Sequence, residues 1–157
     1  MKPLVYLAGG MEYATDGKTW RDEASEKLSS HGIKSWDPYV QEDIIFSEDT
    51  PISLIIKSLN KEKDFKKLRT IMNRIVSLDL DTVLEEASCL LVKYDASVLR
   101  GAGTHAEMSV ATWAALPVHV WLYELTLNDL PSWAIGCIST VSYSLDGAIS
   151  NIIRGLK

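Results

Sequence analysis

The sequence contains few of the side chains that build metal sites and disulfide frameworks. Two cysteines and three histidines occur among its 157 residues. Cys89 and Cys137 each lie in a short apolar segment, which is typical of a buried reduced thiol. The three histidines are far apart and show no metal-ligand spacing. We therefore expect no disulfide, no metal and no cofactor.

Long apolar runs and an excess of positive charge are absent as well. No apolar stretch approaches the roughly 20 residues that span a bilayer, and the N-terminal run lacks the cleavage region of a signal peptide. The formal net charge of -5 argues against a surface that neutralises nucleic-acid phosphates. We therefore expect a cytoplasmic protein with neither a membrane nor a nucleic-acid partner, whereas single nucleotides are compatible with this charge.

Hydrophobic periodicity predicts strands that alternate with helices. Residues 3–9 form an apolar run that ends at a pair of glycines and predicts a central strand. Residues 19–31 carry apolar positions four residues apart, which predicts an amphipathic helix, and residues 33–38 predict a short strand closed by an Asp-Pro turn. Strand, helix, strand is typical of a parallel α/β sheet.

The later segments continue this alternation. Strands are expected within residues 88–94, 117–123 and 137–144, and helices from Thr104 to about Leu116 and within 144–156. We therefore predict one domain, residues 1–157, with a Rossmann-like or flavodoxin-like three-layer α/β fold. Its sheet is expected to be mainly parallel and to have about five strands.

The segment between the second and third expected strands is the least regular. Thr50 and Pro51 resemble the N-cap and the first residue of a helix. Residues 61–76 carry most of the local positive charge at helical spacing, which indicates a solvated helix face, with phosphate or partner binding as the alternative. A further short helix is expected in residues 77–87, with Asp81 as its cap.

Ligands of an open parallel sheet bind at the carboxyl ends of its strands. Two of the expected strands run into glycine-containing loops there, which would let the backbone approach a ligand closely. The N–H groups that open the following helix favour an anion. The candidate ligand-binding residues of these loops are Gly9, Gly10, Met11, Gly103 and Thr104.

Glu107 has two interpretations. The spacing T-H-A-E is that of a capping box, in which the Thr104 side chain accepts from the Glu107 N–H and the glutamate reaches back. The helix dipole would lower the pKa of such a carboxylate and keep it ionised. An ionised carboxylate is also what a nucleophile requires, so the spacing alone leaves both roles open.

Taken together, the strand VYLAGGM, Asp79 ahead of a strand, and G-T-x-x-E resemble the nucleoside 2-deoxyribosyltransferase family, including its related nucleoside monophosphate N-glycosidases and phage-type members. The resemblance covers most of the chain. It implies that Glu107 attacks the anomeric carbon of the sugar and that Asp79, in D-L-D-T-V, assists the departing base. It also implies that Tyr6 contacts the nucleoside and that the protein is a homo-oligomer, a dimer or higher.

Three further residues are candidates for ligand contact. Trp20 and Arg21 match a W-R pair of the phage-type members. With Trp20 in the buried stripe of its helix, Arg21 would be free to reach a phosphate or carboxylate. Asp95 would either bind ribose hydroxyls or end a strand as a turn residue. Arg100 stands where transferases of the family often carry an aspartate, and a cation there suits a 5'-phosphate.

These observations predict cleavage of the N-glycosidic bond of a nucleoside or its 5'-monophosphate, with transfer of the sugar to another base or to water. Three alternatives stay open. A cytokinin-activating type phosphoribohydrolase usually shows a fuller P-G-G-x-G-T-x-x-E, and R-G-A-G-T lacks that first proline. A non-catalytic nucleotide sensor on the same scaffold would bind without releasing a base, and a structural assembly protein would not bind nucleotides.

Overall fold

A computed structural model describes residues 2–46 and 50–157 of the chain. Five parallel strands form one sheet in the order β2-β1-β3-β4-β5. The strands are β1 (Leu4–Gly9), β2 (Lys34–Trp36), β3 (Cys89–Tyr94), β4 (Val118–Leu122) and β5 (Thr140–Ser142). This strand order is that of the flavodoxin-like class of doubly wound folds. The prediction of an α/β fold with about five mainly parallel strands is therefore confirmed.

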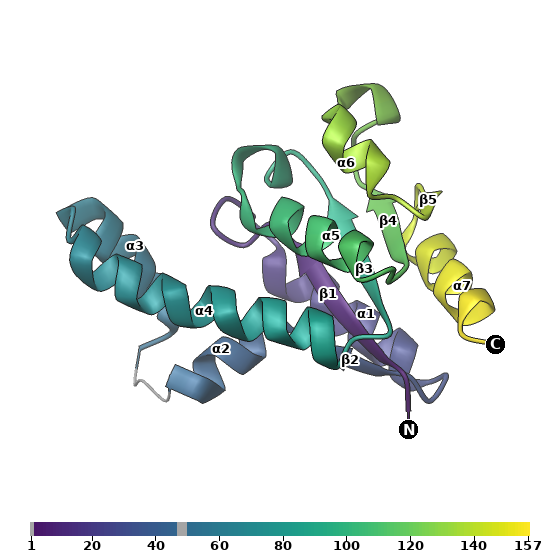
Figure 1. The fold of residues 1–157 in the computed structure, drawn as a ribbon, viewed down its shortest axis with the longest axis horizontal. Coiled ribbons are helices and arrows are strands. Elements are labelled where there is room, and N and C mark those ends of the chain that lie inside the picture. The colour runs from purple at the N-terminus through teal and green to yellow at the C-terminus, as the bar shows by residue number, and fades with distance from the viewer. Residues whose placement is uncertain (1, 47–49) are drawn as a thin grey trace.

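Helices cover both faces of the sheet (Figure 1). They are α1 (Gly17–Ser29), α2 (Pro38–Phe46), α3 (Ile52–Glu62), α4 (Phe65–Glu85), α5 (Gly103–Trp113), α6 (Ser132–Gly136) and α7 (Leu145–Gly155), with short 3-10 helices η1 (Val98–Arg100) and η2 (Leu127–Asp129). The core residues of α1 and α7 pack on one face, and those of α4 and α5 pack on the other. The result is the predicted three-layer arrangement.

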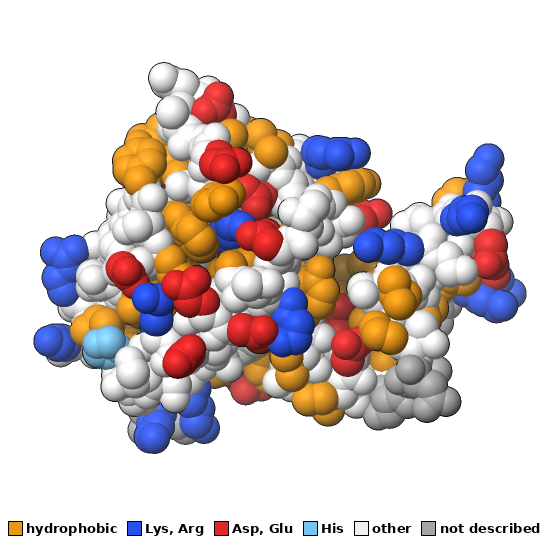
Figure 2. All heavy atoms as spheres, turned by 180° about the vertical axis from the view of Figure 1, so that it is seen from behind, with side chains coloured by type: hydrophobic (Ala, Val, Ile, Leu, Met, Phe, Trp, Pro, Cys, Tyr) orange, Lys and Arg blue, Asp and Glu red, His pale blue; other side chains and the backbone are white. Residues whose placement is uncertain are grey.

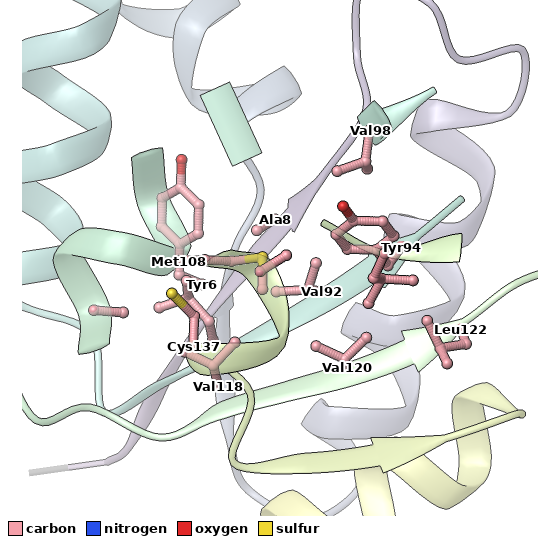
Figure 3. Close-up of a cluster of buried hydrophobic side chains, with 14 of the residues drawn as sticks. Tyr6, Ala8, Val92, Tyr94, Val98, Met108, Val118, Val120, Leu122 and Cys137 are labelled. Atoms are coloured by element: carbon pink, nitrogen blue, oxygen red, sulfur yellow. The ribbon is translucent and has the colours of Figure 1, made fainter. Parts of the chain in front are cut away.

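The central strands β1, β3 and β4 are mainly apolar and buried because both faces of the sheet are covered. Along β1, Val5 and Leu7 pack with α1 and α7, whereas Tyr6 and Ala8 pack with α5, as the two-residue repeat of a strand requires. Figure 3 shows that the ring of Tyr6 belongs to the α5-side core, while its hydroxyl points away from Val118. Strand β1 therefore contributes both to the core and to the carboxyl edge of the sheet.

Helix α2 replaces the turn that the Asp-Pro pair predicted. The Asp37 side chain accepts a hydrogen bond from the Tyr39 N–H at 3.0 Å, and Pro38 is the first helical residue. Proline suits that position because the first N–H groups of a helix have no partner within it. The pair that was interpreted as a turn thus starts a helix, and this helix brings Glu42 to the carboxyl edge.

Helix α4 is one continuous helix of 21 residues, where two helices were expected. Asp64 caps its start by accepting a hydrogen bond from the Lys67 N–H at 3.2 Å. Asp81 is exposed within the helix, so the prediction that it caps a separate helix is wrong. The buried positions of the inner half are Ile75, Asp79, Thr82 and Val83. This stripe continues without a break, and no second helix start is needed.

The start of α3 also differs from the prediction. Pro51, not Thr50, is the N-cap residue, and the helix begins at Ile52. The Ile52 N–H donates to the Asp43 carboxylate at 3.0 Å. A side chain of α2 therefore accepts a hydrogen bond from the start of α3, the capping role predicted for Thr50. This bond joins α2 to α3.

Helices α3 and α4 pack together as an arm (residues 52–85) whose outer end projects beside the sheet (Figure 1). Figure 2 shows lysine and arginine side chains gathered at this outer end. The lysines within residues 61–76 are exposed, which confirms the prediction of a solvated helix face. Within the described ranges, no helix combines the length and apolarity needed to cross a membrane.

Lys93 is a buried cation at the end of β3, on the face covered by α1 and α7. Its side chain is only 2% exposed, and its Nζ lies 2.5 Å from Asp16 Oδ2 and 3.6 Å from Asp95 Oδ2. The ammonium also lies 4.3 Å from the ring centre of Tyr123. Lys93 therefore ties the loop after β1 to the turn after β3.

Candidate functional site

A cavity of about 410 Å³ lies at the carboxyl ends of β1 and β3, bordered by α2, α3, α4 and α5. This is where ligands bind in doubly wound sheets. The predicted site residues that line it are Gly9, Gly10, Met11, Asp79, Gly103, Thr104 and Glu107. Residues that lie 100 positions apart in the sequence are thus brought to one cavity.

Glu107 is held by Tyr6 and does not cap its helix. Helix α5 begins at Gly103, its N-cap residue is Ala102, and no side chain caps it. The capping-box interpretation is therefore wrong, because the helix starts too early for Thr104 to be its cap. The Glu107 side chain instead faces the sheet, where its Oε1 accepts a hydrogen bond from the Tyr6 hydroxyl at 2.8 Å.

Asp79 reaches the same cavity from α4. Its Oδ1 is fully buried and has no hydrogen-bond partner among the residues that the structure describes. A buried carboxyl oxygen without a partner is costly. A donor group on a ligand in the cavity would remove this cost, so Asp79 is a candidate binding atom as well as a candidate acid.

Glu42 is a third buried carboxyl in the cavity, beside the exposed Glu12, and the sequence analysis did not identify it. It lies on α2 with 3% of its surface exposed, and it lines the cavity together with Asp79 and Glu107. The only available signal was helical spacing: Pro38 and Glu42 are four residues apart and both buried. That signal is invisible unless residues 38–46 are recognised as a helix.

Burial raises the pKa of all three carboxyl groups. Loss of water is the main cause in each case, and it raises the pKa of Asp79 to about 6, of Glu107 to about 7 and of Glu42 to about 8. The predicted lowering for Glu107 by the helix dipole is wrong, because burial and the neighbouring Asp79 outweigh it.

Tyr6 opposes the rise at Glu107. Its hydrogen bond lowers the pKa of Glu107 relative to burial alone, as does the more distant Arg21 guanidinium. The pKa of Tyr6 itself lies well above its ordinary value, chiefly because of burial. Tyr6 therefore stays protonated at neutral pH and acts as a fixed donor to the carboxylate.

The loops that border the cavity touch each other through Gly10. A Cβ atom at this position would lie 1.8 Å from the Ser97 Oγ, so only glycine fits. Ser97 in turn is held by Asp95, whose carboxylate accepts from the Ser97 N–H at 2.9 Å. Asp95 is thus a turn residue that does not line the cavity, which agrees with the second of its two predicted roles.

Arg21 and Arg100 do not line the cavity. Arg21 is fully buried and donates to three backbone carbonyls, those of Leu7, Gly9 and Gly17. The expectation that it is free to reach a ligand is therefore wrong, although Trp20 is buried as predicted. Arg100 is exposed, and its guanidinium lies 4.4 Å from the ring centre of Tyr13 at the cavity border.

Comparison with known proteins identifies no relative. No protein-family model matches the chain, and no curated protein matches it. The fold and the three buried carboxyl groups are therefore the features that indicate a function.

Proposed function

We propose that the protein cleaves the N-glycosidic bond of a nucleoside or nucleoside 5'-monophosphate through a covalent glycosyl-enzyme on Glu107. The observation that carries this proposal is the contact between Tyr6 and Glu107, because it holds a buried carboxylate at the ligand-binding edge of the sheet. Asp79 faces the same cavity with an oxygen that lacks a partner. A nucleophile and a group for the departing base are thus within one cavity.

The chemistry has two halves. In the first, a carboxylate oxygen of Glu107 bonds to the anomeric carbon, and the bond from that carbon to the base nitrogen breaks. The base leaves with the bonding electron pair while Asp79 hydrogen-bonds it or gives it a proton. In the second half, water or another base attacks the anomeric carbon and frees Glu107. Two displacements retain the configuration of the sugar, as in retaining glycosidases.

The cavity suits a ligand with a flat base. Its volume lies in the range of about 300–1,000 Å³ that is usual for small-molecule sites. Apolar side chains of the arm form one wall, namely Ile56, Leu68, Met72, Ile75 and Val76. The buried carboxyl groups line the cavity from α2, α4 and α5. An apolar wall for the base and carboxyl groups for the sugar and the ring nitrogens fit a nucleoside.

A homo-oligomer is part of the same proposal. Large aromatic side chains remain exposed in the C-terminal half, namely Trp113, Trp133 and Tyr143. Aromatic residues are enriched in protein interfaces. Sedimentation of the wild-type protein tests this point, and a monomer at all concentrations would contradict it.

A nucleotide sensor without catalysis is the second candidate. The observation in its favour is the pKa of about 7 for Glu107, because about half of the molecules at pH 7 then carry the protonated carboxyl, which does not attack carbon. A sensor binds nucleosides but releases no base.

The decisive experiment measures base release by chromatography. The substrates are ribo- and deoxynucleosides and their 5'-monophosphates, with and without a second free base. Wild type is compared with Glu107→Gln and with Glu26→Gln, an exposed control on α1. We expect release by wild type and the control, and none by Glu107→Gln. Binding without release supports the sensor, and full activity of Glu107→Gln contradicts the proposed nucleophile.

A further inference from the structure

We propose that Glu42 is the general acid of the site: it gives its proton to the departing base, while Asp79 accepts a hydrogen bond from the same base. The inference rests on the proposed function and assigns the two carboxyl groups beside Glu107 different tasks. It also predicts the class of base that the site accepts.

The first support is the position of Glu42. It lines the cavity from α2, whereas Asp79 lines it from α4 and Glu107 from α5. No hydrogen bond from the described residues holds the Glu42 carboxyl. A carboxyl that is shielded from water and accepts no hydrogen bond from the described residues keeps its proton more readily than one that is bound. Glu42 therefore enters the reaction as a donor.

The second support is the charge around Glu42. Asp79 has the largest electrostatic effect on it, followed by Glu107 and by Asp43 of its own helix, and Arg21 on α1 is the one opposing charge of this set. Two other cations lie nearby in the fold: Lys57 lines the cavity from α3, and Arg74 stacks on Phe46 of α2. Both are exposed at the surface. The negative neighbours thus dominate, and they favour the neutral form of Glu42.

The third support is the vacant oxygen of Asp79. The Asp79 Oδ1 is a buried acceptor without a partner among the described residues, whereas the negative neighbours of Glu42 favour its protonated form. A hydrogen-bond donor and an acceptor then both line the cavity. Their complement is a base edge with a ring nitrogen that accepts and an adjacent amino group that donates. Adenine and cytosine have such an edge, whereas hypoxanthine and uracil present a carbonyl in place of the amino group.

The proton balance of the reaction is complete with these groups. As the bond between the anomeric carbon and the base breaks, the Glu42 O–H proton moves to the ring nitrogen, and Glu42 becomes a carboxylate. In the second half, the attacking water or base releases a proton, which returns to Glu42. General acid catalysis of this kind contributes typically about 10²- to 10⁴-fold in rate.

The test uses Glu42→Gln, which keeps the shape and a donor but has no proton to give. Release of adenine is measured from adenosine, or from deoxyadenosine if wild type prefers the deoxynucleoside. The second substrate is the N7-methylated form of the same nucleoside, whose base departs without taking a proton. We expect release from the unmodified nucleoside to fall at least roughly 100-fold with KM within about twofold. Release from the methylated derivative should stay within about twofold of wild type.

Each other outcome overturns the inference in a recognisable way. If the rate of release falls equally for both substrates, Glu42 has a structural role only. If the rate falls for neither substrate, Glu42 takes no part in the reaction. Glu42→Asp is the control for misfolding: it keeps a carboxylic acid at this position and should recover part of the rate that Glu42→Gln loses. Wild type that prefers inosine over adenosine refutes the assigned base edge. Wild type that releases no base from any substrate removes the proposed function itself, and this inference with it.

Discussion

The hydroxyl of Tyr6 on β1 donates a 2.8 Å hydrogen bond to Glu107 on α5, across 101 positions of the sequence. The contact occupies one carboxylate oxygen and leaves the other for chemistry. It also connects the buried core with the cavity, because the ring of Tyr6 is part of the core. The orientation of the proposed nucleophile is therefore fixed by the same packing that stabilises the fold.

Tyr6→Phe should reduce the rate and move its pH dependence. Loss of the hydrogen bond raises the pKa of Glu107, because that bond lowers it in the wild type. In the proposed mechanism Glu107 attacks only as a carboxylate, so the acid limb of the kcat profile should shift to higher pH. We expect kcat at neutral pH to fall roughly 10- to 100-fold, since hydrogen bonds to charged groups contribute about 1.5–3 kcal/mol. An unshifted acid limb in the variant would exclude this role for Tyr6.

Glu42→Gln should make the protein less sensitive to alkaline pH. Folding raises the pKa of Glu42 from 4.5 to about 8, so the folded state binds a proton that the unfolded chain releases. The free energy of unfolding of wild type therefore falls as pH rises through this window. The free energy of unfolding of the variant, relative to that of wild type, should therefore increase by on the order of 2–4 kcal/mol between pH 5 and pH 8.5.

Urea unfolding at the two pH values measures this gain. Glu26→Gln, the exposed control on α1, should follow wild type at both. If the free energies of unfolding of Glu42→Gln and wild type differ by the same amount at pH 5 and at pH 8.5, the pKa of Glu42 is not raised by folding.

Gly10→Ala should loosen the border of the cavity. The added Cβ would meet the Ser97 Oγ at 1.8 Å and the Ser97 Cβ at 2.8 Å, so one of the two loops must move. We expect a loss of about 1–3 kcal/mol in the free energy of unfolding, as for other overpacked sites, together with an increased KM. Gly136→Ala is the control, because a Cβ there meets no atom within 4 Å. Equal stability of the two variants would mean that the loops are not in contact.

Asp16→Asn should destabilise the protein more than Lys93→Met. The Lys93 side chain is 2% exposed, whereas that of Asp16 is 44% exposed. Removing the aspartate charge leaves a buried cation with only the more distant Asp95, whereas removing the lysine charge leaves an aspartate that water can solvate. Urea unfolding of both variants should differ by about 1–2 kcal/mol. The reverse order would mean that the loop around Asp16 does not depend on this ion pair.

The sequence predicted the architecture well because the core strands carry an unbroken apolar pattern. The family resemblance also predicted that Asp79 and Glu107 belong to one site, and both line the same cavity. The helix boundaries were harder. Asp81 looked like a cap in isolation, yet the buried stripe of α4 runs past it.

The surroundings of Glu42 and Arg21 depend on tertiary structure and left little local signal. Glu42 is buried only because α2 turns it toward α4 and α5, and a single glutamate in a polar stretch does not reveal this. Arg21 looked available because its neighbour Trp20 is buried, but three backbone carbonyls surround the guanidinium. These carbonyls belong to β1 and to the first residue of α1, and sequence periodicity does not predict that the two elements meet around this side chain.

Helix α4 links the outer wall of the cavity mechanically to its acidic side. Leu68 and Met72 line the wall, and Asp79 faces the carboxyl cluster, all on one unbroken helix. Because the backbone hydrogen bonds of a continuous helix keep its residues in fixed relative positions, a shift of one part of α4 also moves the other. Any ligand that draws the wall inward must therefore also reposition Asp79 relative to Glu107, so the fit of the base and the spacing of the reacting groups cannot be adjusted independently.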